Sequence, residues 1–70
     1  MLKKGVMMRL SIDVEMWKPD RVKDMIDSII KVSPNTTTRF KEDYEVVAVI
    51  TNGRDMLSIL KMLIEEKYVT

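Results

Sequence analysis

Few side chains in this chain are of a kind that performs chemistry. Its 70 residues include no histidine and no cysteine, which removes the commonest general base, the commonest metal ligand and every thiolate. Asp13 and Glu15 lie two residues apart and would share one face of a strand, but a hard cation such as Ca²⁺ takes about six to eight oxygen ligands. We therefore expect a solvated strand face here, no catalysis, no bound metal and no cofactor.

The cationic side chains suggest a second kind of chemistry, the binding of phosphates. Arg39 and Lys41, with Arg9 on a neighbouring strand, could form a basic strip that meets phosphates. Trp17 or Tyr44 could then stack on a base. The simpler interpretation is an ordinary polar sheet face with aromatic residues at its margins.

The sequence Asn52-Gly53-Arg54 opens an expected helix. Backbone N–H groups and a guanidinium at a helix start are able to hold an anion, so Arg54 is a further candidate for contact with nucleic acid. Without a longer glycine-rich loop, helix capping by Asn52 is the simpler interpretation.

The composition is 46% hydrophobic and 33% charged, with a net charge of +1. These values indicate one globular domain over residues 1–70, with residues 1–7 as a candidate flexible segment. The near-neutral charge argues against a dedicated nucleic-acid binder. The longest apolar run, 46–50, is far shorter than the ~20 residues that cross a bilayer, and the first residues lack the apolar stretch of a signal peptide. A cytoplasmic location without membrane contact is expected.

The first half of the chain changes its hydrophobic period once. Between Met8 and Met16 apolar and polar residues alternate, which predicts a strand with one wet face. Pro19 then suits the first turn of a helix. The helix should end at Ser33, Pro34 and Asn35, because the residue before a proline is pushed out of the helical region. Its expected buried stripe is Val22, Met25, Ile26, Ile29 and Ile30.

The second half predicts a hairpin and a final helix. Residues 36–40 and 44–51 are rich in strand-forming residues and are separated by 41–43 alone. The second of these segments is apolar on both faces, as in a central strand or in a strand whose outer face is partly covered. Asn52 should cap a helix that runs toward Tyr68, with Asp55 at the N3 position. The order β-α-β-β-α predicts an α+β fold, a three-stranded antiparallel sheet with both helices packed on one face.

The final helix has more apolar side chains than one face requires. At 100° per residue they fill an arc of roughly 160°, against the ~100° of a core-facing stripe. A small chain has one sheet to offer, so we expect the surplus to contact another subunit in a homodimer or heterodimer. The core has least need of the side chains at the edges of the arc, which are Leu57 and Ile64 at one margin and Met62 beyond the other. Leu60 lies near the centre of the arc. The predicted protein interface is Met56, Leu57, Ile59, Leu60, Met62, Leu63 and Ile64.

Residues 12–15, Ile-Asp-Val-Glu, lead to a helix that starts with proline, and residues 47–51, Val-Ala-Val-Ile-Thr, lead through a polar turn into the last helix. In element order and length, from Met8 to Tyr68, the chain resembles the small dimerising subunit of the KEOPS complex, the CTAG/Pcc family. The family's last helix carries an Arg and, one turn later, an Asn; Leu57 and Lys61 stand at those positions here. Without these two residues the contacts with the catalytic subunit would differ from those of the family, and a diverged paralogue in a heterodimer would accommodate the departure.

The resemblance implies a non-catalytic subunit of a complex that transfers a threonylcarbamoyl group to tRNA. Its partners would be the KEOPS catalytic subunit and dimerising subunit, and it would meet tRNA only through the complex. Two other classes stay open. A homodimeric nucleic-acid-binding module would show salt-dependent affinity for RNA or DNA. An ACT-like ligand-sensing domain would gain thermal stability from a ligand at its dimer interface.

Overall fold

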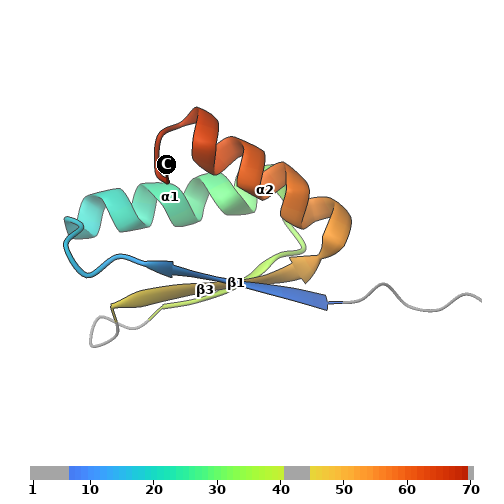
Figure 1. The fold of residues 1–70 in the computed structure, drawn as a ribbon, viewed down its shortest axis with the longest axis horizontal. Coiled ribbons are helices and arrows are strands. Elements are labelled where there is room, and N and C mark those ends of the chain that lie inside the picture. Colours follow the sequence, from blue (N-terminus) through green and yellow to red (C-terminus); the bar gives the residue numbers. More distant parts are fainter. Residues whose placement is uncertain (1–6, 41–44, 70) are drawn as a thin grey trace, which may run out of the picture.

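A computed structural model describes residues 7–40 and 45–69 of the chain. Three parts of the chain lie outside the described residues. They are residues 1–6 of the segment predicted to be flexible, residues 41–44, which include the predicted hairpin connection 41–43 and Tyr44, and Thr70. The elements follow in the predicted order (Figure 1): β1 Met7–Asp13, α1 Pro19–Val32, β2 Thr37–Arg39, β3 Val46–Asn52 and α2 Gly53–Glu65.

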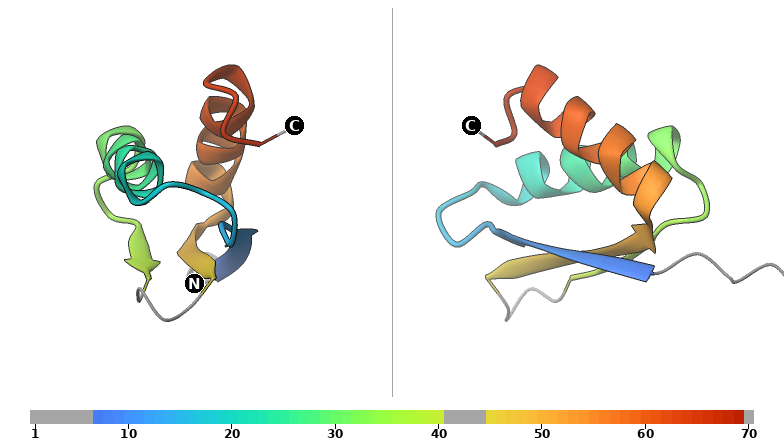
Figure 2. Two further views of the ribbon diagram at one scale, coloured as in Figure 1. Left: turned by 90° about the vertical axis from the view of Figure 1, so that its left-hand side faces the viewer. Right: turned by 45° about the vertical axis from the view of Figure 1, so that its right-hand side comes forward.

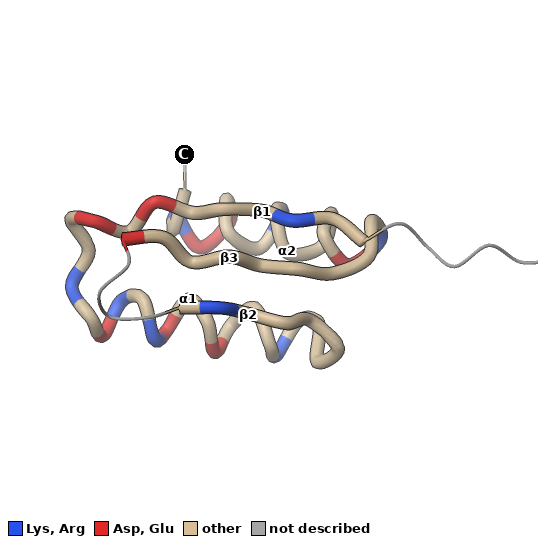
Figure 3. The backbone as a smooth tube through the Cα atoms, turned by 90° about the horizontal axis from the view of Figure 1, so that it is seen from below, with Lys and Arg blue, Asp and Glu red and all other residues tan. Residues whose placement is uncertain are grey.

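The three strands form an antiparallel sheet in the order β1-β3-β2. β3 is therefore the central strand, as its apolar residues on both faces predict. Val47 and Val49 are fully buried on one face, and Ala48 on the other is 4% exposed because Ser11 and Arg39 flank it. Figure 3 shows the three strands from the open side, with β1 and β2 at the two edges.

Both helices cover one face of the sheet, and the predicted α+β fold is confirmed (Figure 2). α2 lies over β1 and β3, whereas α1 lies beside it above β2. The two layers bury their apolar sides against each other. The core that results is Ile12, Val14, Val22, Met25, Ile29, Val47, Val49, Ile59 and Leu63.

The first strand is shorter than its alternation predicts. β1 ends at Asp13, and the expected extension to Met16 is wrong, because a turn begins there in which the Trp17 N–H donates to the Val14 carbonyl (3.0 Å). Val14 remains in the core, but Met16 is 89% exposed instead of continuing the inward row. The alternation of residue types continued past the point where backbone pairing stopped.

α1 begins at Pro19, as predicted, and ends at Val32 just before Ser33. Its stripe is narrower than the sequence suggests. Val22, Met25 and Ile29 are buried and Ile26 is half-buried, but Ile30 is 41% exposed. A single layer of sheet and one neighbouring helix cover about a third of a helix surface, so the fifth apolar residue remains at the margin.

α2 begins with the predicted cap. The Asp55 backbone N–H donates to Oδ1 of Asn52 (2.8 Å), and Nδ2 of Asn52 donates to Oδ2 of Asp55 (3.2 Å). Asp55 also lies in the first turn, where a negative charge is favourable. The helix ends at Glu65, three residues before Tyr68, and Lys67 adopts a left-handed conformation with φ 61°. The Tyr68 N–H donates to the Leu63 carbonyl (2.8 Å), which closes the helix end.

Candidate association surface

The seven residues predicted to form a protein interface divide into two groups in the folded chain. Met56, Ile59 and Leu63 are 3%, 0% and 0% exposed. They pack inside the chain's own core, so they are not available to a partner, and for these three the expected interface role does not fit the folded chain. The physical reason is that the apolar side chains on the inner side of α2 cover the sheet, so only the apolar side chains outside this stripe are accessible to a partner.

The other four residues are at least partly accessible. Leu57 is 71% exposed and Ile64 is 59% exposed. Leu60 and Met62 are half-buried, and Met62 packs against the core. The surplus apolar area of α2 is therefore concentrated at the margin that carries Leu57 and Ile64.

Leu60 shows which way this margin faces. It lines a shallow groove of about 480 Å³ together with Leu10, Ile12 and Asp13 of β1. At 100° per residue Ile64 and Leu57 lie about 40° and 60° around the helix from Leu60, whereas Met62 lies about 200° away. The exposed side chains thus occupy the side of α2 that overhangs β1.

β1 is an edge strand in the part of the chain that the structure describes. The Val14 N–H donates toward β3, to the Glu45 carbonyl (2.7 Å). Backbone groups of successive residues in a strand point to opposite edges, so those of Arg9, Ser11 and Asp13 point away from β3. Among residues 7–40 and 45–69 no strand pairs with this side of β1, so it presents a row of donors and acceptors that is a template for pairing with another strand.

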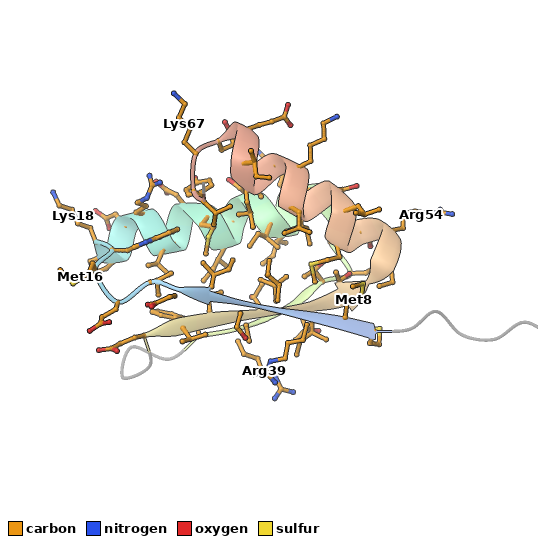
Figure 4. The ribbon with its side chains drawn as sticks, in the orientation of Figure 1. Met8, Met16, Lys18, Arg39, Arg54 and Lys67 are labelled. Atoms are coloured by element: carbon orange, nitrogen blue, oxygen red, sulfur yellow. The ribbon has the colours of Figure 1, made fainter. Side chains whose placement is uncertain are left out.

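Apolar side chains connect the strand edge with the helix margin. Met8, on the helix side of β1, is 47% exposed, and Leu10 is half-buried. Figure 4 shows Met8 between the sheet and the start of α2, and its sulfur lies 3.5 Å from where a Cβ on Gly53 would be. We call Met8, Leu10, Leu57, Leu60 and Ile64, with the free edge of β1, the association surface.

The candidate nucleic-acid contacts are not gathered in one place. Arg9 pairs with Ile50 and Arg39 with Ala48, so both arginines lie on the open face, but β3 separates their strands. Arg54 projects from the start of α2 on the helix side (Figure 4). Lys41 lies outside the described residues. The basic strip was expected on neighbouring strands. The described residues instead place two arginines, Arg9 and Arg39, on opposite sides of the central strand.

Trp17, a candidate for stacking on a base, contacts other residues of the chain. Its ring stacks with Tyr68 at 6.3 Å between centroids, and the Arg21 guanidinium lies 4.9 Å from each of the two ring centroids. Nη2 of Arg21 also donates to the Lys67 carbonyl (2.7 Å). This cluster ties the start of α1 to the end of α2, and no spacing in the sequence indicated it. Tyr44, the other predicted stacking residue, lies outside the described part.

The carboxylate pair has a local structural role. Oδ1 of Asp13 accepts a hydrogen bond from the Glu15 backbone N–H (3.0 Å), so Asp13 stabilises the turn that ends β1. Among residues 7–40 and 45–69 no group of three or more acidic side chains could hold a metal ion.

Within the same described residues, neither helix has the length and hydropathy to cross a membrane. Comparison with protein-family models, curated proteins and solved structures finds no match to this chain.

Proposed function

We propose that this protein is a non-catalytic association module, whose partner binds along the free edge of β1 and against the exposed margin of α2. One observation carries the proposal. The two most exposed apolar side chains of α2, Leu57 at 71% and Ile64 at 59%, lie on the same side of the molecule as an unpaired strand edge.

Both parts of the surface gain from a partner. Full burial of a Leu or Ile side chain is worth about 1.5–3 kcal/mol, so Leu57 and Ile64 together offer a few kcal/mol. A strand added to β1 supplies backbone hydrogen bonds and fixes the partner's direction. A domain of this size buries only about 60% of its unfolded surface by itself, so association also supports the fold.

As the assembly in which the module acts, we propose a tRNA-modifying KEOPS complex in the cytoplasm, in which it is a dimerising subunit or the diverged partner of one. The β-α-β-β-α order and the absence of His and Cys support this proposal. Exposed Leu57 stands where the family carries an Arg, so the contact there would be apolar. Co-expression with the KEOPS subunits of the source organism tests it; failure to co-elute, with tRNA modification unchanged when the protein is omitted, would contradict it.

The association surface itself is tested by Leu57→Lys, with Ser58→Lys as the matched control. Both residues are exposed on α2, but Ser58 lies 100° further around the helix. In analytical ultracentrifugation we expect Leu57→Lys to weaken association at least tenfold and Ser58→Lys to leave it unchanged, with the same circular dichroism for both. Equal association of wild type and Leu57→Lys would show that the margin of α2 is not part of the surface.

A further inference from the structure

We propose that the partner at β1 is a second copy of this chain, paired antiparallel through β1 about a two-fold axis at Ser11, so that two three-stranded sheets become one sheet of six strands. The inference rests on the proposed association function and specifies its partner and its register. It is carried by the backbone direction of β1 and by the order of its charges.

The free backbone groups match themselves in this register. Arg9, Ser11 and Asp13 direct their N–H and C=O groups away from β3, as the bond from the Val14 N–H to the Glu45 carbonyl indicates. With the axis at Ser11, the two Ser11 residues lie opposite each other and each Arg9 lies opposite Asp13 of the other copy. All three pairs are hydrogen-bonded pairs, which gives about six new backbone hydrogen bonds.

The charges on the open face select the same register. Arg9 and Asp13 are both exposed and are equally spaced on either side of Ser11. Antiparallel pairing about Ser11 therefore brings two arginine–aspartate pairs directly opposite each other, which is favourable by roughly 0.2–1 kcal/mol each. Oδ1 of Asp13 accepts from the Glu15 N–H, and Oδ2 is left for Arg9.

The neighbouring registers are less favourable. An axis at Arg9 places two guanidinium groups directly opposite, and an axis at Asp13 does the same with two carboxylates; like charges in this position are destabilising. An axis at Leu10 keeps the inward and outward faces but leaves Arg9 opposite Ser11. An axis at Ile12 places Arg9 opposite Glu15, but Glu15 lies in the turn beyond the end of β1. Among the residues of β1 itself, Ser11 is thus the one centre about which opposite charges coincide.

The helix side of the sheet is apolar in this register. Leu10 lies opposite Ile12 of the other copy, and Met8 lies opposite Val14. A two-fold axis perpendicular to the sheet keeps both α2 helices on the same face, where their margins bearing Leu57, Leu60 and Ile64 approach each other across the axis. The same patch of each copy contributes to the contact, as an isologous interface requires. The contact covers the accessible parts of Leu57, Leu60 and Ile64 beside the groove.

The pairing also leaves only short strands at the outer edges of the sheet. After β1 is paired, both outer edges of the six-stranded sheet are β2, which has three residues. Short edge strands are one of the ways in which proteins avoid further edge-to-edge association. The assembly therefore closes at two copies and does not continue as a filament.

A charge swap in the full-length chain tests the register. Arg9→Asp and Asp13→Arg each place like charges opposite each other, whereas the double variant restores two opposite pairs. By analytical ultracentrifugation we expect each single variant to weaken the dimer at least tenfold and the double variant to return to within about threefold of wild type. Arg39→Asp is the matched control, since Arg39 lies on the same open face but on β2, and it should leave the dimer unchanged.

A cross-link provides a second measurement with both charges intact, since Asp13→Arg also removes the turn hydrogen bond. In the predicted dimer the two Ser11 Cα atoms are about 5.5 Å apart, so a Ser11→Cys chain should be joined by a short thiol cross-linker. Thr37→Cys is the control; it lies five strand spacings from its copy, roughly 24 Å, and should not be joined.

Three results would overturn the inference. They are a wild-type chain that is monomeric up to about 1 mM, where association is worth only ~4 kcal/mol, a double variant as weak as the singles, or equal cross-linking at Ser11→Cys and Thr37→Cys. None of them removes the association surface if Leu57→Lys still abolishes binding to another protein. Conversely, insensitivity to Leu57→Lys with an intact charge swap would remove the α2 part of the proposed surface and keep the strand pairing.

Discussion

The two helices have nearly the same length, 14 residues in α1 and 13 in α2, yet they differ in how completely the chain uses them. Each buries three apolar side chains, Val22, Met25 and Ile29 in α1 and Met56, Ile59 and Leu63 in α2. Outside this stripe α1 exposes mainly charged residues, and its exposed apolar side chains, Ile30 and Val32, are each 41% accessible. α2 exposes Leu57 and Ile64 to a much greater degree.

Position in the sheet explains the difference. α1 lies over the short β2 edge, and its outer side meets solvent. α2 overhangs the long β1 edge, beside the groove that Leu60 shares with β1. In a small domain, an apolar margin above an unpaired edge strand is a better indication of a partner than the number of apolar residues in the helix.

The largest expected effects concern the buried residues, which should not distinguish the helices. Ile29→Ala in α1 and Ile59→Ala in α2 each remove a fully buried side chain and should each lower the free energy of unfolding by about 2–5 kcal/mol. Urea denaturation measures this. The exposed counterparts should separate the helices: Ile30→Ala should cost about 1 kcal/mol or less at any protein concentration, whereas Leu57→Ala should lose stability only where the chain associates. A concentration-dependent loss in both would contradict the comparison.

The start of α2 is capped by a side chain, and its loss should have an intermediate effect. Asn52→Ala removes the acceptor of the Asp55 N–H and should cost about 1 kcal/mol. Asn52→Ser keeps a side-chain oxygen there and should cost only a few tenths. Thermal unfolding followed by circular dichroism compares them, and equal melting temperatures for the two variants would contradict the capping role.

Adding a capping side chain at the start of α1 should have the smallest effect, and it should raise the free energy of unfolding instead of lowering it. Its N-cap, Lys18, has extended backbone angles and makes no side-chain capping hydrogen bond. Lys18→Ser supplies the missing acceptor at the same backbone geometry and should raise the free energy of unfolding by roughly 0.5–1 kcal/mol. Lys23→Ser makes the same replacement inside α1, where serine is a weaker helix former, and should lower it by a few tenths. The same denaturation measurement tests both; stabilisation by neither would show that the start of α1 is already satisfied.

Local residue preferences in the sequence were sufficient to predict the helices and strands and some of the residues at which they begin or end. Pro19 starts α1, Asn52 and Asp55 cap α2, and residues apolar on both faces marked β3 as central. The two helix starts depend on contacts within a few residues along the chain, and the two apolar faces of β3 are a pattern of residue types, so a linear sequence displays both. The end of β1 was missed because pairing with β3, and not residue alternation, decides where a strand stops.

The exposed apolar side chains of α2 were predicted in outline only. The apolar arc of α2 indicated that a surplus exists, and it marked Leu57 and Ile64 as marginal, but it placed Leu60 near the centre of the core. In the folded chain Leu60 is half-buried, and the buried residues Met56, Ile59 and Leu63 are centred on Leu63, about 60° around the helix from Leu60 toward Met62. The position of a neighbouring helix sets that centre, and a helical period carries no information about it.

The sequence by itself determined which residues alternate, which repeat with helical period and which begin a helix, because steric and hydrogen-bonding preferences act over one or two turns. Tertiary structure alone decided that the free backbone groups of β1 belong to Arg9, Ser11 and Asp13 and that the surplus side of α2 overhangs this strand. These facts depend on how strands distant in sequence pair and on which side each helix packs. Both are set by the burial of the whole core and not by any single segment of the chain.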